Sequence, residues 1–272
     1  AMIIRAGQFA ILGIAAFALT GLLTWPVRAL AIRLGAMDAP NLARKTQATP
    51  VPYLGGVAIA LGITVTTFAA VFVGGNKSGE NVSQLKDLAL TVLVPALLLG
   101  VMGLVDDLRS LPPWPRLITQ SLVGSIVAFI IVQGGTVGTP FGTSTLNTAV
   151  TIFWIVGICN SINFFDNLDG AASGAVAIAA LGVFFIAFDR GQEVVSALSI
   201  VTAGATIGFL MWNKSPAKIY MGDAGALFLG VIIAVATIRV NPGIVPTWKS
   251  FMIPIMLLAV PLLDTCVAVF SR

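Results

Sequence analysis

The chain has 272 residues, of which 57% are hydrophobic and only 10% are charged, with a formal net charge of +4. Soluble domains carry about 25% charged residues, so this composition excludes an ordinary soluble protein and indicates a lipid bilayer as the surroundings. The 15 basic residues are scattered among short polar segments without interleaved aromatic side chains. This scatter argues against nucleic acid as a partner.

Apolar runs close to the length of about 20 residues that crosses a bilayer recur from end to end. We count nine of them, at 3–23, 56–73, 88–105, 117–132, 149–162, 171–188, 194–212, 225–238 and 251–270. Short polar segments separate the runs, without an internal repeat. The sequence therefore predicts an all-α, polytopic membrane helix bundle of about nine transmembrane helices in one domain covering residues 1–272. Pro254 and Pro261 fall inside the last run, where we expect them to kink the helix.

Acidic residues sort unevenly between the two sides of this predicted bundle. Nine of the 15 basic residues lie on the side of the first loop, which favours a cytoplasmic location for that side. Seven of the acidic residues, all aspartates, lie on the same side: Asp38, Asp106, Asp107, Asp166, Asp169, Asp223 and Asp264. Short carboxylates near lysine and arginine suit a Mg²⁺-dependent phosphate site, because they supply hard oxygen ligands for the ion and the basic side chains neutralise phosphate.

Asp106 and Asp107 follow directly on the run 88–105. Adjacent ionised carboxylates repel each other, so a cation, a held proton or a catalytic role would have to offset the repulsion. A solvated helix end next to Arg109 is the alternative.

Two amides and two carboxylates recur every three residues at the end of the run 149–162: Asn160, Asn163, Asp166 and Asp169. In a helix this spacing keeps them roughly on one face, where they could converge on one ligand. Helix capping is the alternative explanation.

Two further loops carry residues that suit phosphate chemistry. In the segment 212–225, Asp223 stands between glycines that allow exposed backbone N–H groups at the start of a helix, which favours an anion. A plain turn with an aspartate cap is the alternative. The loop 38–56 carries the pair Arg44 and Lys45, which could equally set topology or contact anionic lipids.

Five blocks in this order resemble the polyprenyl-phosphate N-acetylhexosamine-1-phosphate transferases, membrane enzymes that start lipid-linked glycan synthesis in bacteria. They read "DAPNLARKTQATPVPYLGG", "GLVDDLRSLPPWPRLITQ", "NSINFFDNLDGAASG", "NKSPAKIYMGDAGALFLG" and "PLLDT". "YLGGVAI" and "MGDAG" are more similar to the UDP-GlcNAc branch than to the phospho-MurNAc-pentapeptide transferases. The resemblance implies transfer of GlcNAc-1-phosphate from a UDP-N-acetylhexosamine to undecaprenyl or another polyprenyl phosphate. UMP would be released, with Mg²⁺ (or Mn²⁺) as cofactor, at the cytoplasmic face of the bacterial inner membrane.

The resemblance also implies roles for individual residues. Asn163 and Asp223 would hold the metal ion, and Asp106 would deprotonate or orient the polyprenyl phosphate with Asp107 assisting. The residues expected to shape the nucleotide pocket or to lie near phosphates are Asp166, Asp169, Asn213, Lys45 and Arg116.

The chain departs from that family in containing no histidine, whereas the family usually carries a histidine-rich loop after the "PLLDT" helix. We therefore expect it to be truncated at its C-terminus relative to the family. Gln47, Tyr53 and Asn167 also stand where histidine, arginine and glycine are common in the family. Three alternatives remain: a phospho-MurNAc-pentapeptide transferase, a membrane transporter, and a lipid-binding protein without catalysis. A transporter would favour inverted repeats and acidic residues near mid-membrane. A homodimer stays open as the assembly.

Overall fold

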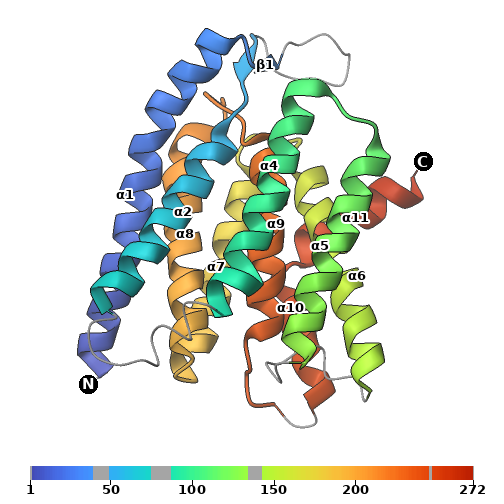
Figure 1. Ribbon diagram of the computed structural model, residues 1–272. Helices are drawn as coiled ribbons and strands as arrows, with labels where there is room; N and C mark the ends of the chain where they lie inside the picture. Colours follow the sequence, from blue (N-terminus) through green and yellow to red (C-terminus); the bar gives the residue numbers. More distant parts are fainter. Residues whose placement is uncertain (1, 39–48, 75–86, 134–142, 245–246, 272) are drawn as a thin grey trace.

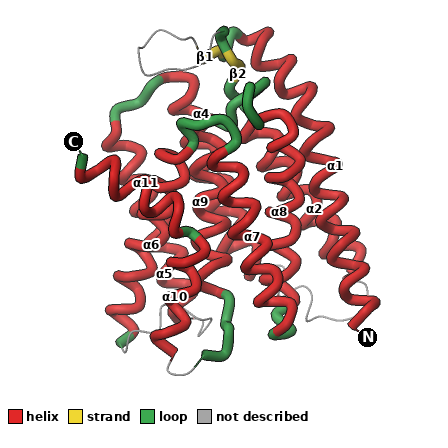
Figure 2. The backbone as a smooth tube through the Cα atoms, turned by 180° about the vertical axis from the view of Figure 1, so that it is seen from behind, coloured by secondary structure: helices red, strands yellow, loops and turns green. Residues whose placement is uncertain are grey.

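The computed structural model describes residues 2–38, 49–74, 87–133, 143–244 and 247–271 of the chain (Figure 1). Almost all of these residues are helical, and Figure 2 shows the helices running side by side in one bundle. The helices longer than two turns are α1 (Met2–Leu34), α2 (Gly55–Gly74), α4 (Val94–Arg109), α5 (Pro113–Gln133), α6 (Ser144–Phe165), α7 (Ala171–Asp189), α8 (Glu193–Asn213), α9 (Gly222–Arg239) and α11 (Ala259–Phe270). The prediction of a polytopic helical membrane protein is confirmed.

Each predicted apolar run forms helix, but the number of spans is approximate. Within the described residues, seven helices are long and apolar enough to cross a membrane, and a bent pair at the C-terminal end would make eight. The described apolar part of α2, Gly55–Ala70, is shorter than these.

Helix α1 continues eleven residues beyond the end predicted at residue 23, through Pro26 and as far as Leu34. A helix that leaves the bilayer no longer needs apolar side chains, so hydropathy alone ends it too early. In this extension the Arg28 Nε donates to the Lys218 carbonyl oxygen at 2.9 Å, which joins α1 to the loop before α9.

The last run, predicted as one span, is broken. A 3₁₀ segment (Thr247–Phe251) leads into the short α10 (Met252–Leu257), and a bend of 77° separates this part from α11. Pro254 and Pro261 flank the break, where proline removes a backbone donor and favours the start of a new helix. The expected kink is confirmed, and α11 leaves the bundle axis to pack on α6 (Figure 1).

Helix α9 forms the centre of the bundle, with almost every side chain buried, and packs against α2, α4 and α6. Its first turn is approached very closely. A Cβ at Gly103 of α4 would lie 2.4 Å from the Asp223 carbonyl oxygen, and one at Gly56 of α2 would lie 2.1 Å from the Gly225 nitrogen. Both positions therefore require glycine, and both set the distance of a neighbouring helix from the start of α9.

A small β arrangement holds the loop before α9 at the same end. Strands β1 (Met37–Asp38) and β2 (Val51–Pro52) pair antiparallel, and Tyr53 forms a parallel bridge with Tyr220. The chain then continues into α2, whose Gly55 amide donates to the Tyr220 carbonyl oxygen at 2.9 Å.

Candidate functional site

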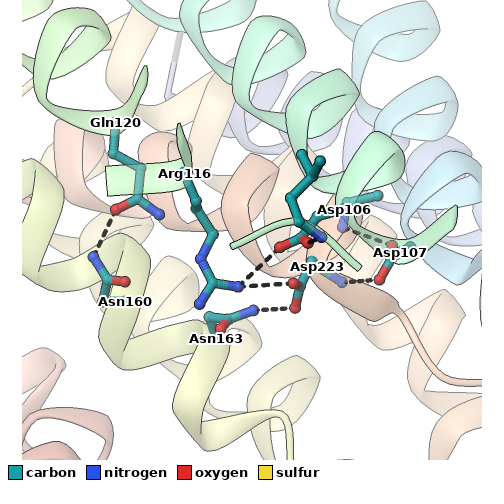
Figure 3. Close-up of polar contacts among 9 residues, drawn as sticks. Asp106, Asp107, Arg116, Gln120, Asn160, Asn163 and Asp223 are labelled. Atoms are coloured by element: carbon teal, nitrogen blue, oxygen red, sulfur yellow. Dashed lines mark hydrogen bonds and ion pairs between the residues drawn. The ribbon is translucent and has the colours of Figure 1, made fainter. Parts of the chain in front are cut away.

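Polar side chains from four helices meet where α4 and α6 end and where α5 and α9 begin (Figure 3). The Asn163 Nδ2 of α6 donates to the Asp223 Oδ1 of α9 at 2.5 Å. From α5, the Arg116 Nη1 contacts the Asp223 Oδ2 at 2.8 Å and the Asp106 Oδ2 of α4 at 3.2 Å. A single guanidinium nitrogen thus bridges two carboxylates that come from helices far apart in the sequence.

Asp106 and Asp107 point in different directions, although they are neighbours in the chain. The Asp106 Oδ2 contacts Arg116, whereas its Oδ1 accepts from the Leu111 backbone amide at 2.7 Å. Asp107 instead accepts from the Asp223 and Ala224 amides, at 2.9 and 3.1 Å. Arg116 and backbone amides thus offset the repulsion expected between the two neighbours.

The exposed N–H groups predicted at the start of α9 therefore exist, but the anion on them is the Asp107 carboxylate of the same chain. Gly222 permits this arrangement, because its φ is +70° and a Cβ there would lie 2.6 Å from an Asp107 carboxylate oxygen. Both Asp107 oxygens are occupied by these contacts. They support a role in holding α4 against α9, and an assisting role in catalysis stays a prediction.

Asp166 and Asp169 lie in the turn after α6, because the helix ends at Phe165 and the three-residue spacing no longer keeps them on its face. The Asp169 Oδ2 accepts from the amide of Ala217, in the loop before α9, at 2.9 Å. Burial, followed by the charges of Asp223 and Asp107, raises the pKa of Asp166 well above its ordinary value. Asp166 thus places a further carboxyl group beside Asp223, in surroundings that favour its protonated form.

Asn160 does not join the residues around Asp223. Its Nδ2 donates to the Gln120 Oε1 of α5 at 2.7 Å and to the Val156 carbonyl oxygen at 2.8 Å. The prediction that all four residues of the 160–169 series converge on one point is therefore wrong. Gln120 was not predicted from the sequence, and the feature that could have indicated it is a side-chain amide one helical turn after Arg116 inside a predicted span.

Asn213 is buried and makes its contacts within the protein. Its Oδ1 accepts from the Gly170 amide at 3.2 Å and the Ser173 hydroxyl at 2.9 Å, and its Nδ2 donates to the Ile219 carbonyl oxygen at 3.0 Å. These contacts support a structural role, and a nucleotide contact stays a prediction. Lys45 lies outside the described residues. Asp264 is exposed on α11, apart from the group that we call the Asp223 cluster: Asp106, Arg116, Asn163 and Asp223.

The oxygen atoms around Asp223 are of the hard type that Mg²⁺ prefers, but they are fewer than a complete metal site needs. Among the described residues, three or more His, Cys, Asp or Glu side chains do not gather into a ready metal cage. Mg²⁺ usually takes one or two carboxylates and fills its other positions with water and phosphate oxygens. One oxygen of Asp106 and one of Asp223 already contact the same positive group, the Arg116 guanidinium. Rotating the side-chain amide of Asn163 by 180° would present its oxygen in place of its NH₂ group.

Comparisons with known proteins show which family the chain belongs to. The sequence profile of glycosyl transferase family 4 matches residues 89–241. A probable undecaprenyl-phosphate N-acetylglucosaminyl 1-phosphate transferase of Bacillus subtilis is 34% identical, over 93% of this chain and 69% of that protein. The decaprenyl-phosphate N-acetylglucosaminephosphotransferase of Mycobacterium tuberculosis is 30% identical, over 97% of this chain and 71% of that protein.

A phospho-N-acetylmuramoyl-pentapeptide-transferase of Streptococcus thermophilus is 34% identical over a shorter stretch, 55% of this chain and 48% of that protein. The profile match includes α4, α5, α6 and α9, which supply every side chain of the Asp223 cluster. The chain therefore belongs to glycosyl transferase family 4, as a member that spans the membrane.

Proposed function

We propose that this protein transfers N-acetylglucosamine 1-phosphate from UDP-GlcNAc to a polyprenyl phosphate, releasing UMP. The observation that carries the proposal is the meeting of Asp106, Arg116, Asn163 and Asp223 at one end of the bundle. The names of the Bacillus and Mycobacterium relatives, which specify a polyprenyl-phosphate acceptor and an N-acetylglucosamine group, support it. A transporter would favour acids at mid-membrane, whereas these carboxylates lie at helix ends.

In this reaction an oxygen of the lipid phosphate attacks the phosphorus that carries the sugar. A new P–O bond forms, the bond to the bridging oxygen breaks, and that oxygen leaves with UMP. The second pKa of a phosphate monoester is about 6, so the attacking oxygen is largely deprotonated at neutral pH. Asp106 therefore needs only to orient the lipid phosphate, and a strong base is not required.

Phosphoryl transfer depends on positioning the substrates and neutralising their charge, and each side chain of the Asp223 cluster would contribute to one of these. Asp223, Asn163 and Asp106 would hold a magnesium ion against the diphosphate, where the ion would neutralise charge on the phosphate oxygens. Arg116, released from the carboxylates, would then contact phosphate. Asp166 and Asp169, in the turn beside Asp223, would face the sugar nucleotide.

The proposed site faces the cytoplasm of a bacterial inner membrane. The excess of basic residues on the side of the first loop supports this orientation. The reaction would start the synthesis of a lipid-linked glycan of the cell envelope.

The test is UMP release by the purified protein in nanodiscs, with UDP-GlcNAc and undecaprenyl phosphate, in Mg²⁺ or in EDTA. We expect release that needs both substrates and the metal, and that Asp223→Asn reduces at least a hundredfold. UMP release without the lipid, or full activity in EDTA, would contradict the proposal. Replacing the donor with UDP-MurNAc-pentapeptide or UDP-GalNAc tests the sugar, and a preference for the pentapeptide donor would favour the peptidoglycan branch.

A further inference from the structure

A second polar contact lies one helical turn deeper in the bundle than the Asp223 cluster. Gln120 follows Arg116 by four residues in α5, so the two side chains share a face and Gln120 lies about 6 Å further along the span. Gln120 is completely buried, and its Nε2 has no hydrogen-bond partner. Figure 3 shows Gln120 beside Arg116, with its oxygen toward Asn160.

The orientation of the Gln120 amide follows from its neighbours. The Val156 carbonyl can only accept, so the Asn160 side chain must turn its NH₂ group toward it. The same NH₂ group then donates to Gln120, which must present its oxygen. The Gln120 NH₂ group is thus directed away from Asn160 and held there by two hydrogen bonds in series.

Buried amide donors almost always find an acceptor, because an unpaired N–H in an apolar interior is costly. Here the free donor lies next to the site at which anionic substrates would react. Its preset direction is what recognition of an oxygen acceptor requires, since little conformational freedom remains to be lost on binding.

We propose that the Gln120 NH₂ group donates a hydrogen bond to a phosphate oxygen of the lipid substrate and so helps to select it. This inference rests on the proposed function and adds a residue to its acceptor site. Arg116, on the same face of α5, leaves the carboxylates when substrate binds and uncovers Gln120. Side-chain rearrangements of this size are common on binding.

The depth of Gln120 decides between the two phosphate-bearing substrates. A polyprenyl chain lies in the hydrocarbon, so its phosphate reaches the site from the membrane side. The sugar nucleotide is water-soluble and arrives from the helix ends. Gln120 lies on the membrane side of Arg116, within the span Pro113–Gln133, and therefore meets the lipid phosphate first.

The test compares Gln120→Met with wild type in transfer and in binding. A hydrogen bond to a charged group is worth about a factor of ten or more, so we expect KM for undecaprenyl phosphate to rise at least tenfold. KM for UDP-GlcNAc should change less than twofold. Without UDP-GlcNAc and metal, farnesyl phosphate should bind at least tenfold more weakly to the variant, whereas farnesol should bind both proteins equally.

Thr151→Val provides the matched control, because Thr151 of α6 is also completely buried with an unpartnered hydroxyl. It should leave both KM values unchanged. If Gln120→Met does not fold, Gln120→Glu replaces it, since a glutamate oxygen still accepts from Asn160 while the free NH₂ becomes a repelling oxygen. Gln120→Glu should weaken farnesyl phosphate binding even more than Gln120→Met.

Unchanged lipid affinity in these variants, or equal losses for lipid and sugar nucleotide, would overturn the inference. The proposed function fails separately. If the wild-type protein releases no UMP but binds farnesyl phosphate more tightly than the Gln120 variants do, the transferase proposal is wrong and the inference about Gln120 still holds.

Discussion

Arg116 holds the position between Asp106 and Asp223 that a metal ion would take, so removing it should strengthen metal binding to the substrate-free protein. Its Nη1 lies 3.2 and 2.8 Å from the two carboxylates, and its side chain is 21% exposed. A hydrogen bond to a charged group contributes about 1.5–3 kcal/mol, and partial exposure reduces this. We count about 2 kcal/mol for both contacts, which corresponds to about thirtyfold in a dissociation constant.

The assay is Mn²⁺ binding to Arg116→Met and to wild type, followed by electron paramagnetic resonance in nanodiscs without nucleotide. We expect the variant to bind Mn²⁺ about thirtyfold more tightly. With UDP-GlcNAc present the order should reverse, because the wild-type guanidinium would then contact phosphate instead of the carboxylates. Arg109→Met is the control: it removes the same charge from an exposed position in the last turn of α4 and should leave Mn²⁺ affinity unchanged.

Weaker or unchanged Mn²⁺ binding in Arg116→Met would refute this reasoning. It would mean that the guanidinium supports the arrangement of the carboxylates and does not compete for them. An equal gain in Arg109→Met would assign the effect to the general field of the membrane face.

Three further predictions concern the residues around the start of α9. Asp107→Ala leaves two backbone N–H groups of α9 without an acceptor and should lower the stability by about 1–2 kcal/mol, measured by thermal unfolding in detergent; an unchanged melting temperature would contradict the capping role. The raised pKa of Asp166 means that the folded protein holds its proton more tightly than the unfolded chain. The free energy of unfolding of the protein in EDTA should therefore fall as pH rises from about 4 toward the raised pKa of Asp166, and Asp166→Asn should remove this pH dependence. Gly103→Ala places a Cβ 2.4 Å from the Asp223 carbonyl oxygen and should destabilise by about 1–3 kcal/mol, whereas Gly157→Ala, with open space around it, should not.

The main features of the fold were predictable because hydropathy dominates the folding of a chain in a bilayer. Each of the nine runs forms helix, and proline positions marked the break before α11. Hydropathy was less informative where helices leave the membrane. The part of α1 beyond residue 23 contains a contact between Arg28 and the Lys218 carbonyl, 190 residues away, and a local sequence pattern carries no signal for such a contact.

The residue types indicated which side chains lie at the site, but not which partner each of them contacts. Asn163 and Asp223 were expected together, and they are in contact. Asp106 and Asp107 looked alike in the sequence, yet one pairs with Arg116 and the other caps α9. Two successive residues on a helix are about 100° apart, so their partners depend on which helices pack on each side, and this is set by long-range packing.

The burial of α9 and the polar cluster at its first turn are connected. The backbone of Asp223 could move relative to α4 and α6 only if α9 shifted. Close contacts of Gly103 and Gly56 with the first turn of α9 hold that helix in place. A rigid centre keeps carboxylates from several helices at fixed separation despite their mutual repulsion. Their charge then favours whatever cation can reach them, which in the free protein is Arg116. Under the proposed function, the same repulsion that makes the cluster costly to build would favour the uptake of a divalent ion with its phosphate ligand.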